Sequence, residues 1–396
     1  MDFDVLIVGG GLAGASLAAA LAEERHRVAL IERKRPPAPG DPWDSRVYTL
    51  TPASIAFLER IGAWQRVARE RVTPIYDMRV FGDDGRSHLD FSAYESGLLQ
   101  LGATVESGRV QHALWQGLQE QHNLSLVCPA EPLELRRASD SVDIRLDLGR
   151  TIRARLVVGA DGADSWVRQA AGMEARSESY EQLGVVANFA CGRAHRNVAF
   201  QWFRSDGVLA FLPLPEQRVS IVWSTSRAHA SELLSQSPAA LCVRVAEASQ
   251  GALGELEPLT PPAAFPLSRM ASRRFGQERV ALIGDSAHVV HPLAGQGINL
   301  GLGDAHCLAD LLSEAPDPGD RMLLRRFERS RAEDVLTLRW ATHGLFRLFC
   351  TDRALIRRIR NLGLNLTNAN PVIKSLLTRR ATAVGGGIDQ HLQGTS

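Results

Sequence analysis

Three glycines near the start of the chain have the spacing that binds a diphosphate. Gly9, Gly11 and Gly14 form the pattern G-x-G-x-x-G, and Glu32 ends the next apolar run. The first glycine of this pattern permits a tight turn, the second lets the backbone approach a pyrophosphate, and the third lets a helix pack closely. A carboxylate at the position of Glu32 accepts hydrogen bonds from a ribose hydroxyl. These residues therefore predict a dinucleotide site.

The flanking segments predict the elements that such a site requires. Residues 5–8 and 28–31 are apolar runs that favour strands buried on both faces. Residues 13–24 are rich in strong helix formers, and the N-terminus of that helix would face the diphosphate. One rival interpretation is a membrane span over 5–22, which the interrupting glycines and the preceding acidic residues disfavour. The other is a glycine-rich turn without a ligand. This unit alone does not separate FAD from NAD.

Two further segments place carboxylates at the ends of expected strands. Asp161 and Gly162 follow the apolar residues 156–158, and Asp285 follows 280–283. Ligands of α/β sheets gather at such strand ends. A loop follows Asp285, and the backbone N–H groups of the helix after it can stabilise negative charge on a bound ring. The residues of this loop expected beside that ring are Pro292, Gly295, Gln296 and Gly297.

The order of these motifs resembles the single-component aromatic flavin hydroxylases, which share the fold of para-hydroxybenzoate hydroxylase. The motifs are G-x-G-x-x-G, ADG-x-x-S-x-x-R and GD-x-AH-x-x-x-P-x-x-GQG-x-N-x-G, and the match extends over most of the chain. It is most similar to the hydroxylases of ubiquinone biosynthesis. The resemblance implies that FAD is the cofactor. Beside Gly9, Gly11, Gly14 and Glu32, it implies the cofactor-binding residues Arg46, Gln111, Asp161, Gly162, Asp285, Gly297 and Asn299.

The same resemblance implies what several of these residues do. Asp285 would bind the ribityl chain of FAD, and Arg46 and Gln111 would contact its diphosphate and ribityl region. Asp161 and Gly162 would serve both FAD and the approaching nicotinamide cofactor.

The expected fold class is α/β, with a Rossmann-like FAD-binding βαβ fold, an interleaved antiparallel-sheet substrate domain and a C-terminal helical segment. A chain of 396 residues is too long for one core of ordinary size, which favours intertwined domains. The expected bounds are residues 1–75, 100–180 and 270–325 for a discontinuous FAD-binding domain, 76–99 and 181–269 for the substrate domain, and 326–396 for the helical region.

Three apolar runs between residues 198 and 224 predict neighbouring antiparallel strands of the substrate domain. They carry Trp202, Phe211 and Trp223, which are expected to wall an apolar substrate pocket above the flavin ring. The alternative for each is ordinary burial in the core, where large aromatic side chains are common.

Composition and cysteine spacing exclude several other classes of protein. The formal net charge is +1, so no strong field favours a nucleic-acid partner, and none is expected. The five cysteines lie apart without a C-x-x-C pair, which disfavours disulfide frameworks, zinc sites and disulfide reductases and fits a reducing cytoplasm. His288 and His291 are close in sequence, but no four-ligand set completes them, so no metal is expected.

The C-terminal region is basic and predicts a docking segment. Between residues 353 and 391 the sole acid is Asp389, and the bases are Arg353, Arg357, Arg358, Arg360, Lys374, Arg379 and Arg380. An apolar group lies upstream, formed by Leu345, Phe346, Leu348 and Phe349. Such a segment suits contact with a membrane surface or a quinone-synthesis complex. The alternative is a helix packed on the core with a solvated cationic face. The expected location is cytoplasmic or peripheral on the inner membrane, without a transmembrane anchor.

The resemblance implies an FAD-dependent monooxygenase that hydroxylates the aromatic ring of a polyprenylated phenol in ubiquinone biosynthesis. It would use NAD(P)H and O2 through a C4a-hydroperoxyflavin, with Arg168 as a candidate contact of the nicotinamide nucleotide. No catalytic acid or base is assigned, because the cofactor carries the chemistry and the protein positions the ring and excludes water. The alternatives are a hydroxylase of a soluble phenol, an alkene epoxidase, a polyprenyl reductase, or a flavin-bearing subunit with a mainly structural task.

Overall fold

The computed structural model describes most of the chain. The backbone is described for residues 2–22, 25–147, 149–290, 297–349 and 354–386, and the side chains for these residues except 339–343, 345–349 and 354–359. All structural statements below concern these residues.

A mostly parallel sheet forms around the first βαβ unit, with the strand order β18-β19-β11-β1-β2-β8. The apolar runs at 5–8 and 28–31 form its centre, and residues Val5 to Val8 are almost fully buried. Its strands are β1 (Phe3–Val8), β2 (Val28–Ile31), β8 (Leu124–Val127), β9 (Pro132–Arg137), β10 (Val142–Leu146), β11 (Thr151–Gly159), β18 (Gly276–Gln277) and β19 (Val280–Leu282). Strands β1, β2, β11 and β19 run parallel to one another, as a Rossmann-like unit requires.

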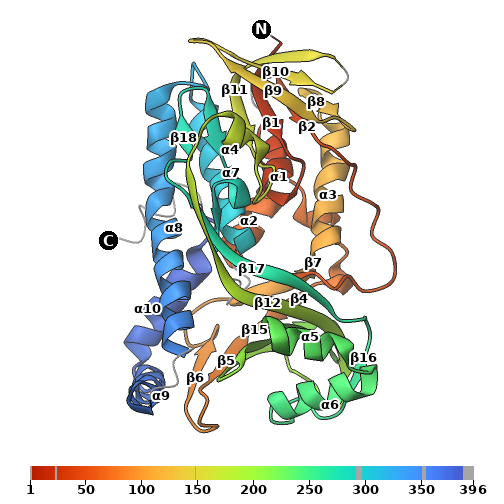
Figure 1. The fold of residues 1–396 in the computed structure, drawn as a ribbon, viewed down its shortest axis with the longest axis vertical. Helices are drawn as coiled ribbons and strands as arrows, with labels where there is room; N and C mark the ends of the chain where they lie inside the picture. Colours follow the sequence, from red (N-terminus) through yellow and green to blue (C-terminus); the bar gives the residue numbers. More distant parts are fainter. Residues whose placement is uncertain (1, 23–24, 148, 291–296, 350–353, 387–396) are drawn as a thin grey trace.

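Helices cover this first sheet. The helices and short 3-10 turns of this half are α1 (Leu12–Ala20), α2 (Pro52–Arg60), η1 (Trp64–Arg66), η2 (Arg69–Arg71), α3 (Ser107–Glu120), α4 (Trp166–Ala170), η3 (Gly284–Ser286) and α7 (Gly297–Ser313). Helix α1 packs between α3 and α7 (Figure 1).

The second sheet is mainly antiparallel and lies below the first in Figure 1, with the order β20-β17-β12-β15-β14-β13-β5-β6. Its strands are β5 (Asp77–Phe81), β6 (His88–Ser92), β12 (Ala175–Cys191), β13 (Val198–Arg204), β14 (Gly207–Leu214), β15 (Arg218–Ser226), β16 (Leu256–Pro258), β17 (Ala263–Ser272) and β20 (His288–Val289). The long strands β12 and β17 run from one half of the molecule to the other. We therefore keep the predicted domain bounds as a proposal, because these two strands belong to both halves.

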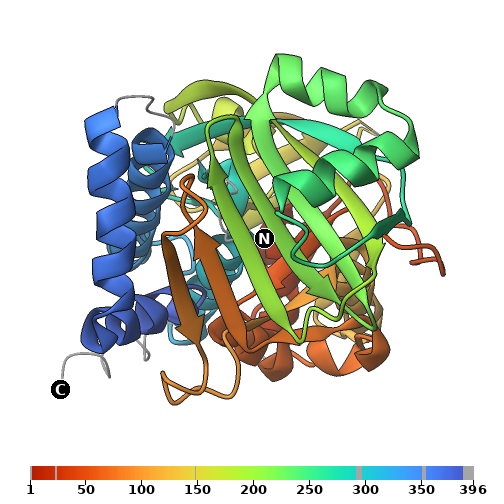
Figure 2. The same ribbon diagram turned by 90° about the horizontal axis from the view of Figure 1, so that it is seen from below.

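The two halves meet at a small sheet and are flanked by helices. Strands β3 (Val47–Leu50), β7 (Gly102–Glu106) and β4 (Thr73–Ile75) lie between the large sheets. Helices α5 (Arg227–Ser235) and α6 (Pro238–Ala248) cover the outer face of the second sheet, as Figure 2 shows from below. The hydroxyl of Thr104 on β7 donates to the carbonyl of Pro213 on β14, which ties the small sheet to the second sheet.

The chain ends in helices along one side of the molecule. They are α8 (Arg321–Phe349), α9 (Ala354–Asn368) and α10 (Pro371–Ala383). Helix α9 packs on β6 and α10 on α2, so this side joins both halves (Figures 1 and 2). Within the described residues, no helix combines the length and the hydropathy that a bilayer crossing requires. The expected fold class is confirmed: a Rossmann-like unit, an antiparallel sheet and C-terminal helices.

Candidate functional site

The glycine turn after β1 packs tightly against protein backbone at Gly9 and Gly14 and faces open space at Gly11. Gly9 has φ +105°, and a Cβ on it would lie 2.4 Å from the carbonyl oxygen of Ala160. A Cβ on Gly14 would lie 2.0 Å from the carbonyl oxygen of Gly9, so both positions require glycine. A Cβ on Gly11, in contrast, would meet nothing within 4 Å. The N-terminus of α1 therefore presents bare backbone to open space, which is the cradle that a diphosphate needs.

Strand β2 and helix α3 hold this turn in place. The Gly10 N–H donates to the Glu32 carboxylate at 2.5 Å, and the indole N–H of Trp115 donates to the Gly10 carbonyl at 2.8 Å. The side-chain amide of Gln111 also approaches that carbonyl, at 3.4 Å. The structure thus brings Glu32 and Gln111 to the two sides of the turn, and their contacts with a ribose and with the diphosphate stay predictions.

Asp161, at the end of β11, has one carboxylate oxygen without a hydrogen bond. Its Oδ2 accepts from the backbone N–H of Val167 at 3.0 Å, whereas Oδ1 is buried and has no partner among the described residues. Buried acceptors of this kind are rare in folded proteins and are usually satisfied by water or a ligand. A Cβ on the adjacent Gly162 would meet nothing within 4 Å, so the backbone is open to a ligand here too.

Arg168 has an internal task that the sequence did not predict. Its buried guanidinium donates to the carbonyls of Ser286 and Ala163, at 2.9 and 2.7 Å. The side chain therefore ties the segment after β11 to η3. A direct nucleotide contact stays a prediction.

Asp285 lies in η3, between surrounding protein and open space. Burial raises the pKa of its carboxyl, as does the charge of Asp304, while His288 and Arg46 act to lower it. Asp285 is nevertheless exposed to solvent. A raised pKa together with solvent exposure indicates a carboxylate that protein encloses on most sides and that is open on one side. Such a group suits hydrogen bonds from the hydroxyls of a ribityl chain.

A buried ion network supports η3 from behind. Asp304 on α7 is fully buried; its Oδ2 accepts from the Gly284 N–H at 2.9 Å and lies 2.7 Å from His288 Nε2. Its Oδ1 accepts from Arg331 Nε on α8 at 2.9 Å. Burial by itself would raise the pKa of Asp304, but His288 and Arg331 outweigh it and the pKa is lowered. Sequence reasoning missed this network, although an aspartate on the apolar face of the α7 helix was a usable signal.

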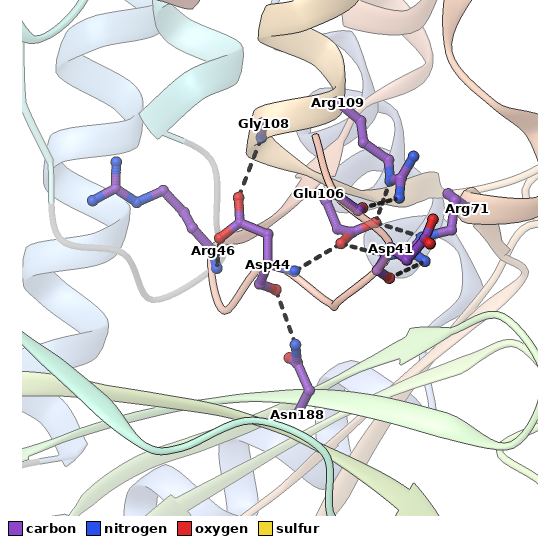
Figure 3. Close-up of polar contacts among 9 residues, drawn as sticks. Asp41, Asp44, Arg46, Arg71, Glu106, Gly108, Arg109 and Asn188 are labelled. Carbon is purple, nitrogen blue, oxygen red and sulfur yellow. Dashed lines mark hydrogen bonds and ion pairs between the residues drawn. The ribbon is translucent and has the colours of Figure 1, made fainter. Parts of the chain in front are cut away.

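A second network fixes the loop that carries Arg46 (Figure 3). Glu106 is buried and accepts from Arg71 at 2.7 Å, from Arg109 at 2.8 Å and from the Asp44 N–H at 2.8 Å. Burial would raise the pKa of Glu106, but these hydrogen bonds outweigh it, so the pKa is lowered. The Arg46 side chain extends away from this cluster in Figure 3 and is free to meet a ligand.

Asp44 connects that loop to the surrounding elements. Its carboxylate accepts from the N–H groups of Arg46 and Gly108, at 2.9 and 3.3 Å. Its carbonyl accepts from the Asn188 side-chain amide on β12 at 2.9 Å (Figure 3). The position of Arg46 therefore depends on both halves of the molecule.

The first turn of α7 is held through Asn299. The Asn299 amide donates to the Thr49 carbonyl at 2.9 Å, and its oxygen accepts from the Thr51 N–H at 3.0 Å. The side chain positions α7 against β3 and α2, so a direct cofactor contact of Asn299 stays a prediction. Gly297 is the first residue of α7. The other predicted loop residues, Pro292, Gly295 and Gln296, lie outside the described residues, as does His291.

The predicted substrate wall is corrected by the structure. Trp202, Phe211 and Trp223 are almost fully buried in the core between the second sheet and helices α5 and α6. Asn188 reaches up to Asp44 from the opposite face of the same sheet. The three aromatic side chains therefore point away from the cofactor side. The prediction failed because these strands are buried on both faces, and their sequence does not mark which face turns inward.

The face toward the cofactor half carries smaller side chains. Ala210, Leu212 and Val222 are half-buried there, and Val186 and Asn188 stand beside them in the strand register. The Asn188 Oδ1 is buried and has no hydrogen bond among the described residues. This face is a mainly apolar floor with one unsatisfied acceptor.

The basic C-terminal residues are partly used inside the molecule. Arg360 is buried and pairs with Asp83 at 2.5 Å, and Lys374 pairs with Glu95 at 3.0 Å. Arg379 and Arg380 are exposed. The remaining predicted bases and the upstream apolar group lie outside the described side chains. Within the described residues, no three His, Cys, Asp or Glu side chains are grouped as a metal site would require.

Comparison with known proteins identifies the family. Residues 2–337 match the model of the FAD binding domain family. The chain is 34% identical to the 3-demethoxyubiquinol 3-hydroxylase of Escherichia coli, over 94% of this chain and 96% of that protein. The chain belongs to the FAD-dependent ubiquinone hydroxylases. It is also 37% identical to ubiquinone hydroxylase UbiL of Rhodospirillum rubrum, over 96% of this chain and 89% of the relative.

Solved structures agree with this hydroxylase at the level of the fold. PqsL of Pseudomonas aeruginosa superposes with a TM-score of 0.77, with 24% identity over 91% of this chain and 99% of that chain. The p-nitrophenol 4-monooxygenase PnpA of Pseudomonas putida superposes with a TM-score of 0.78, with 18% identity over 97% of this chain and 98% of that one. The resemblance and the FAD cofactor predicted from the sequence are confirmed.

The site fits FAD on structural grounds as well. The bare backbone at Gly11 and Gly162, the unsatisfied oxygen of Asp161 and the half-enclosed Asp285 lie along the ends of β1, β11 and β19. These features match a diphosphate, a polyol chain and a ring. The contacts of the individual residues with FAD stay predictions.

Proposed function

We propose that this hydroxylase adds one oxygen atom to the aromatic ring of a polyprenylated phenol in ubiquinone biosynthesis. The observation that carries the proposal is the match, over nearly the whole chain, to relatives named as ubiquinone-pathway hydroxylases. The co-substrates are O2 and NAD(P)H, the reductant typical of this class of enzyme.

The residues of the chain would bind FAD, orient the substrate ring and enclose the reacting atoms. When bound, FAD takes up electrons from the reductant and activates O2 for transfer of one oxygen atom. Gly9, Gly11 and Gly14 would receive the diphosphate, Glu32 a ribose, and Asp285 with Arg46 the ribityl region. The N–H groups at the start of α7, from Gly297 on, would stabilise negative charge on the ring. No acid or base is required of the protein.

The substrate ring would lie between the cofactor and the inner face of the second sheet. Ala210, Leu212 and Val222 supply an apolar surface that excludes water from the reacting atoms. The free oxygen of Asn188 supplies an acceptor for a phenolic hydroxyl. We propose these residues in place of Trp202, Phe211 and Trp223.

The test is turnover of a short-chain prenylated phenol by the FAD-loaded protein, with NADH or NADPH and O2, followed by mass spectrometry. The proposal expects a product heavier by one oxygen atom, with the new hydroxyl on the ring. A product heavier by two hydrogens would instead identify a polyprenyl reductase, and an oxygen on the side chain an epoxidase. The Asp285→Ala variant is the control and should lose turnover together with FAD.

A mainly structural role is tested in cells. If the chain acted mainly as an assembly subunit, Asp285→Ala would restore ubiquinone to cells that lack this gene, provided the variant folds. If cells that carry only Asp285→Ala lack ubiquinone and accumulate a phenol without one hydroxyl, the result supports the enzymatic role.

We propose further that the α9–α10 surface docks on an anionic lipid bilayer. This surface consists of the exposed side chains Leu362, Leu366, Val372, Ile373, Leu376 and Leu377. Neither helix contains an aspartate or glutamate, and Arg379 and Arg380 are exposed beside the apolar side chains. Apolar side chains flanked by cations suit the interface of an anionic membrane. A polyprenyl tail could then stay in the bilayer while the ring enters the protein.

A further inference from the structure

The segment that follows α10 lies against the first turns of α7 and α2. The hydroxyl of Thr51, the N-cap of α2, donates to the carbonyl of Val384 at 2.5 Å across 333 residues of sequence. Gly385 and Gly386 are buried. Nothing in the sequence motifs of the flavin site points to these residues.

Gly385 fits its place because it has no side chain. It has φ +101°, and a Cβ on it would lie 2.3 Å from Ser54 Oγ and 3.2 Å from the carbonyl oxygen of Asn299. A Cβ on Gly303, one turn further along α7, would lie 2.9 Å from the Gly385 Cα. The backbone of the segment thus touches α2 and α7 at van der Waals distance, and any side chain at 385 would push them apart.

The contact continues into the hydrogen bonds that hold α7. The hydroxyl of Thr51 donates to the Val384 carbonyl, and its backbone N–H donates to the Asn299 side-chain oxygen at 3.0 Å. Asn299 in turn donates to the Thr49 carbonyl at 2.9 Å. The segment, the α2 cap and the first turn of α7 therefore form one connected network.

Val384 also packs against two parts of the motif that runs from Gly284 to Gly301. It contacts the cluster of Val290, Leu300, Val335 and Leu338. Val290 follows Asp285 closely, and Leu300 belongs to the first turn of α7 after Gly297. A residue that directly follows α10 thus packs against both segments that would flank the bound ring in the proposed site.

We propose that Val384 and Gly385 are positioning residues of the flavin site. They hold the start of α7 so that its backbone N–H groups meet the bound FAD, and they do so through Thr51, Asn299 and Val290. The inference rests on the proposed flavin site, and it does not depend on which phenol is the substrate.

The test compares two matched glycine substitutions in the full chain. Gly385→Ala should raise the FAD dissociation constant roughly tenfold, because a side chain there displaces the first turn of α7. Gly363→Ala is the control: it lies on α9, and a Cβ on it would meet nothing within 4 Å. FAD affinity is measured by fluorescence titration of apoprotein, and the bound flavin by its visible absorbance and circular dichroism.

A milder pair keeps the proposal testable if Gly385→Ala does not fold. Val384→Ala removes packing against the cluster that contains Val290 and Leu300, whereas Val372→Ala removes a side chain on the preceding helix α10 that is 77% exposed. We expect weaker FAD binding and a changed flavin spectrum for Val384→Ala alone. A lower melting temperature of the apoprotein with an unchanged FAD dissociation constant and spectrum would show a merely structural role and overturn the proposal. Because the experiment measures FAD binding, a failure to hydroxylate phenols would not be mistaken for a failure of this proposal.

Discussion

At the scale of the residue, the carboxylates of the site differ in environment and therefore in task. Asp304 is fully enclosed by Arg331, His288 and the Gly284 N–H, and these partners lower its pKa despite burial. A fully paired charge of this kind holds structure, because removal of one partner would leave the other buried alone. Among the described residues Asp285 has no such set of hydrogen-bond partners, and burial raises its pKa. It is thus the carboxylate of the two that is available to a ligand.

His306 provides a prediction about pH. Its ring stacks on Phe57 at 4.6 Å, and burial lowers its pKa, which Asp310 on α7 partly opposes while Arg60 on α2 and Arg331 on α8 add to it. The unfolded chain therefore binds a proton more readily than the native one, so this residue's contribution to stability is present above the unfolded pKa of 6.5 and is lost as pH falls below it.

The measurement is urea unfolding of wild type and His306→Gln at pH 7.5 and about pH 5.5, which lie on either side of the unfolded histidine pKa. We expect the stability of the wild type to fall more than that of the variant on acidification. Equal losses in the two proteins would show that another group is responsible.

At the scale of the element, each central strand of the second sheet serves two different surfaces. On β15, Trp223 faces the core under α5 and α6, and the adjacent Val222 faces the cofactor half. The alternation of side chains along a strand makes neighbours in sequence independent in function. The two positions can therefore be tested separately.

We predict that Trp223→Ala lowers the free energy of unfolding by about 3–5 kcal/mol, as for other buried tryptophans, with FAD affinity unchanged. Val222→Ala should cost about 1 kcal/mol and change KM for the phenol. Denaturant unfolding, FAD titration and steady-state kinetics of the two variants check this. A raised KM for Trp223→Ala without loss of stability would return the aromatic residue to the pocket wall.

At the scale of the whole molecule, the C-terminal helices contact the candidate flavin site on one side and solvent on the other. Helix α8 supplies Arg331 behind η3, and α10 leads to Val384 and Gly385 beside α7. The same α10 presents apolar side chains outward, and ion pairs of Arg360 and Lys374 fasten α9 and α10 to the rest of the protein. The proposed docking surface and the proposed cofactor support thus both belong to the layer of C-terminal helices along one side of the molecule (Figure 1).

The docking proposal predicts binding to vesicles that contain phosphatidylglycerol. Leu376→Asp should abolish co-sedimentation, whereas Val243→Asp, at a residue of α6 that is likewise 57% exposed, should leave it intact. Added salt should weaken binding, because part of the attraction is electrostatic. Equal binding of both variants would reject the surface, and a dimer that Leu376→Asp dissociates would identify a second copy as its occupant.

The parts of the site that were predicted from sequence are those that depend on neighbours in the chain. Gly9, Gly11 and Gly14 lie in one turn between a strand and a helix, and Glu32 ends the next strand. Asp161 and Asp285 follow apolar runs that could only be buried strands of the same sheet. Tight turns and buried strands depend on residues that are close in sequence. The Rossmann-like unit and its carboxylates could therefore be predicted from short segments.

Tertiary structure alone decided which faces and which distant residues complete the site. Trp202, Phe211 and Trp223 pack in the core under α5 and α6 and do not face the cofactor. The sequence of a strand that is buried on both faces does not show which way each side chain points. Arg331 meets Asp304, and Gly385 meets Ser54, only after the chain has folded across long sequence separations. The sequence by itself determined the cofactor and the core of the fold, since these rest on local patterns. Packing between distant segments determined the substrate face and the supports behind the flavin site.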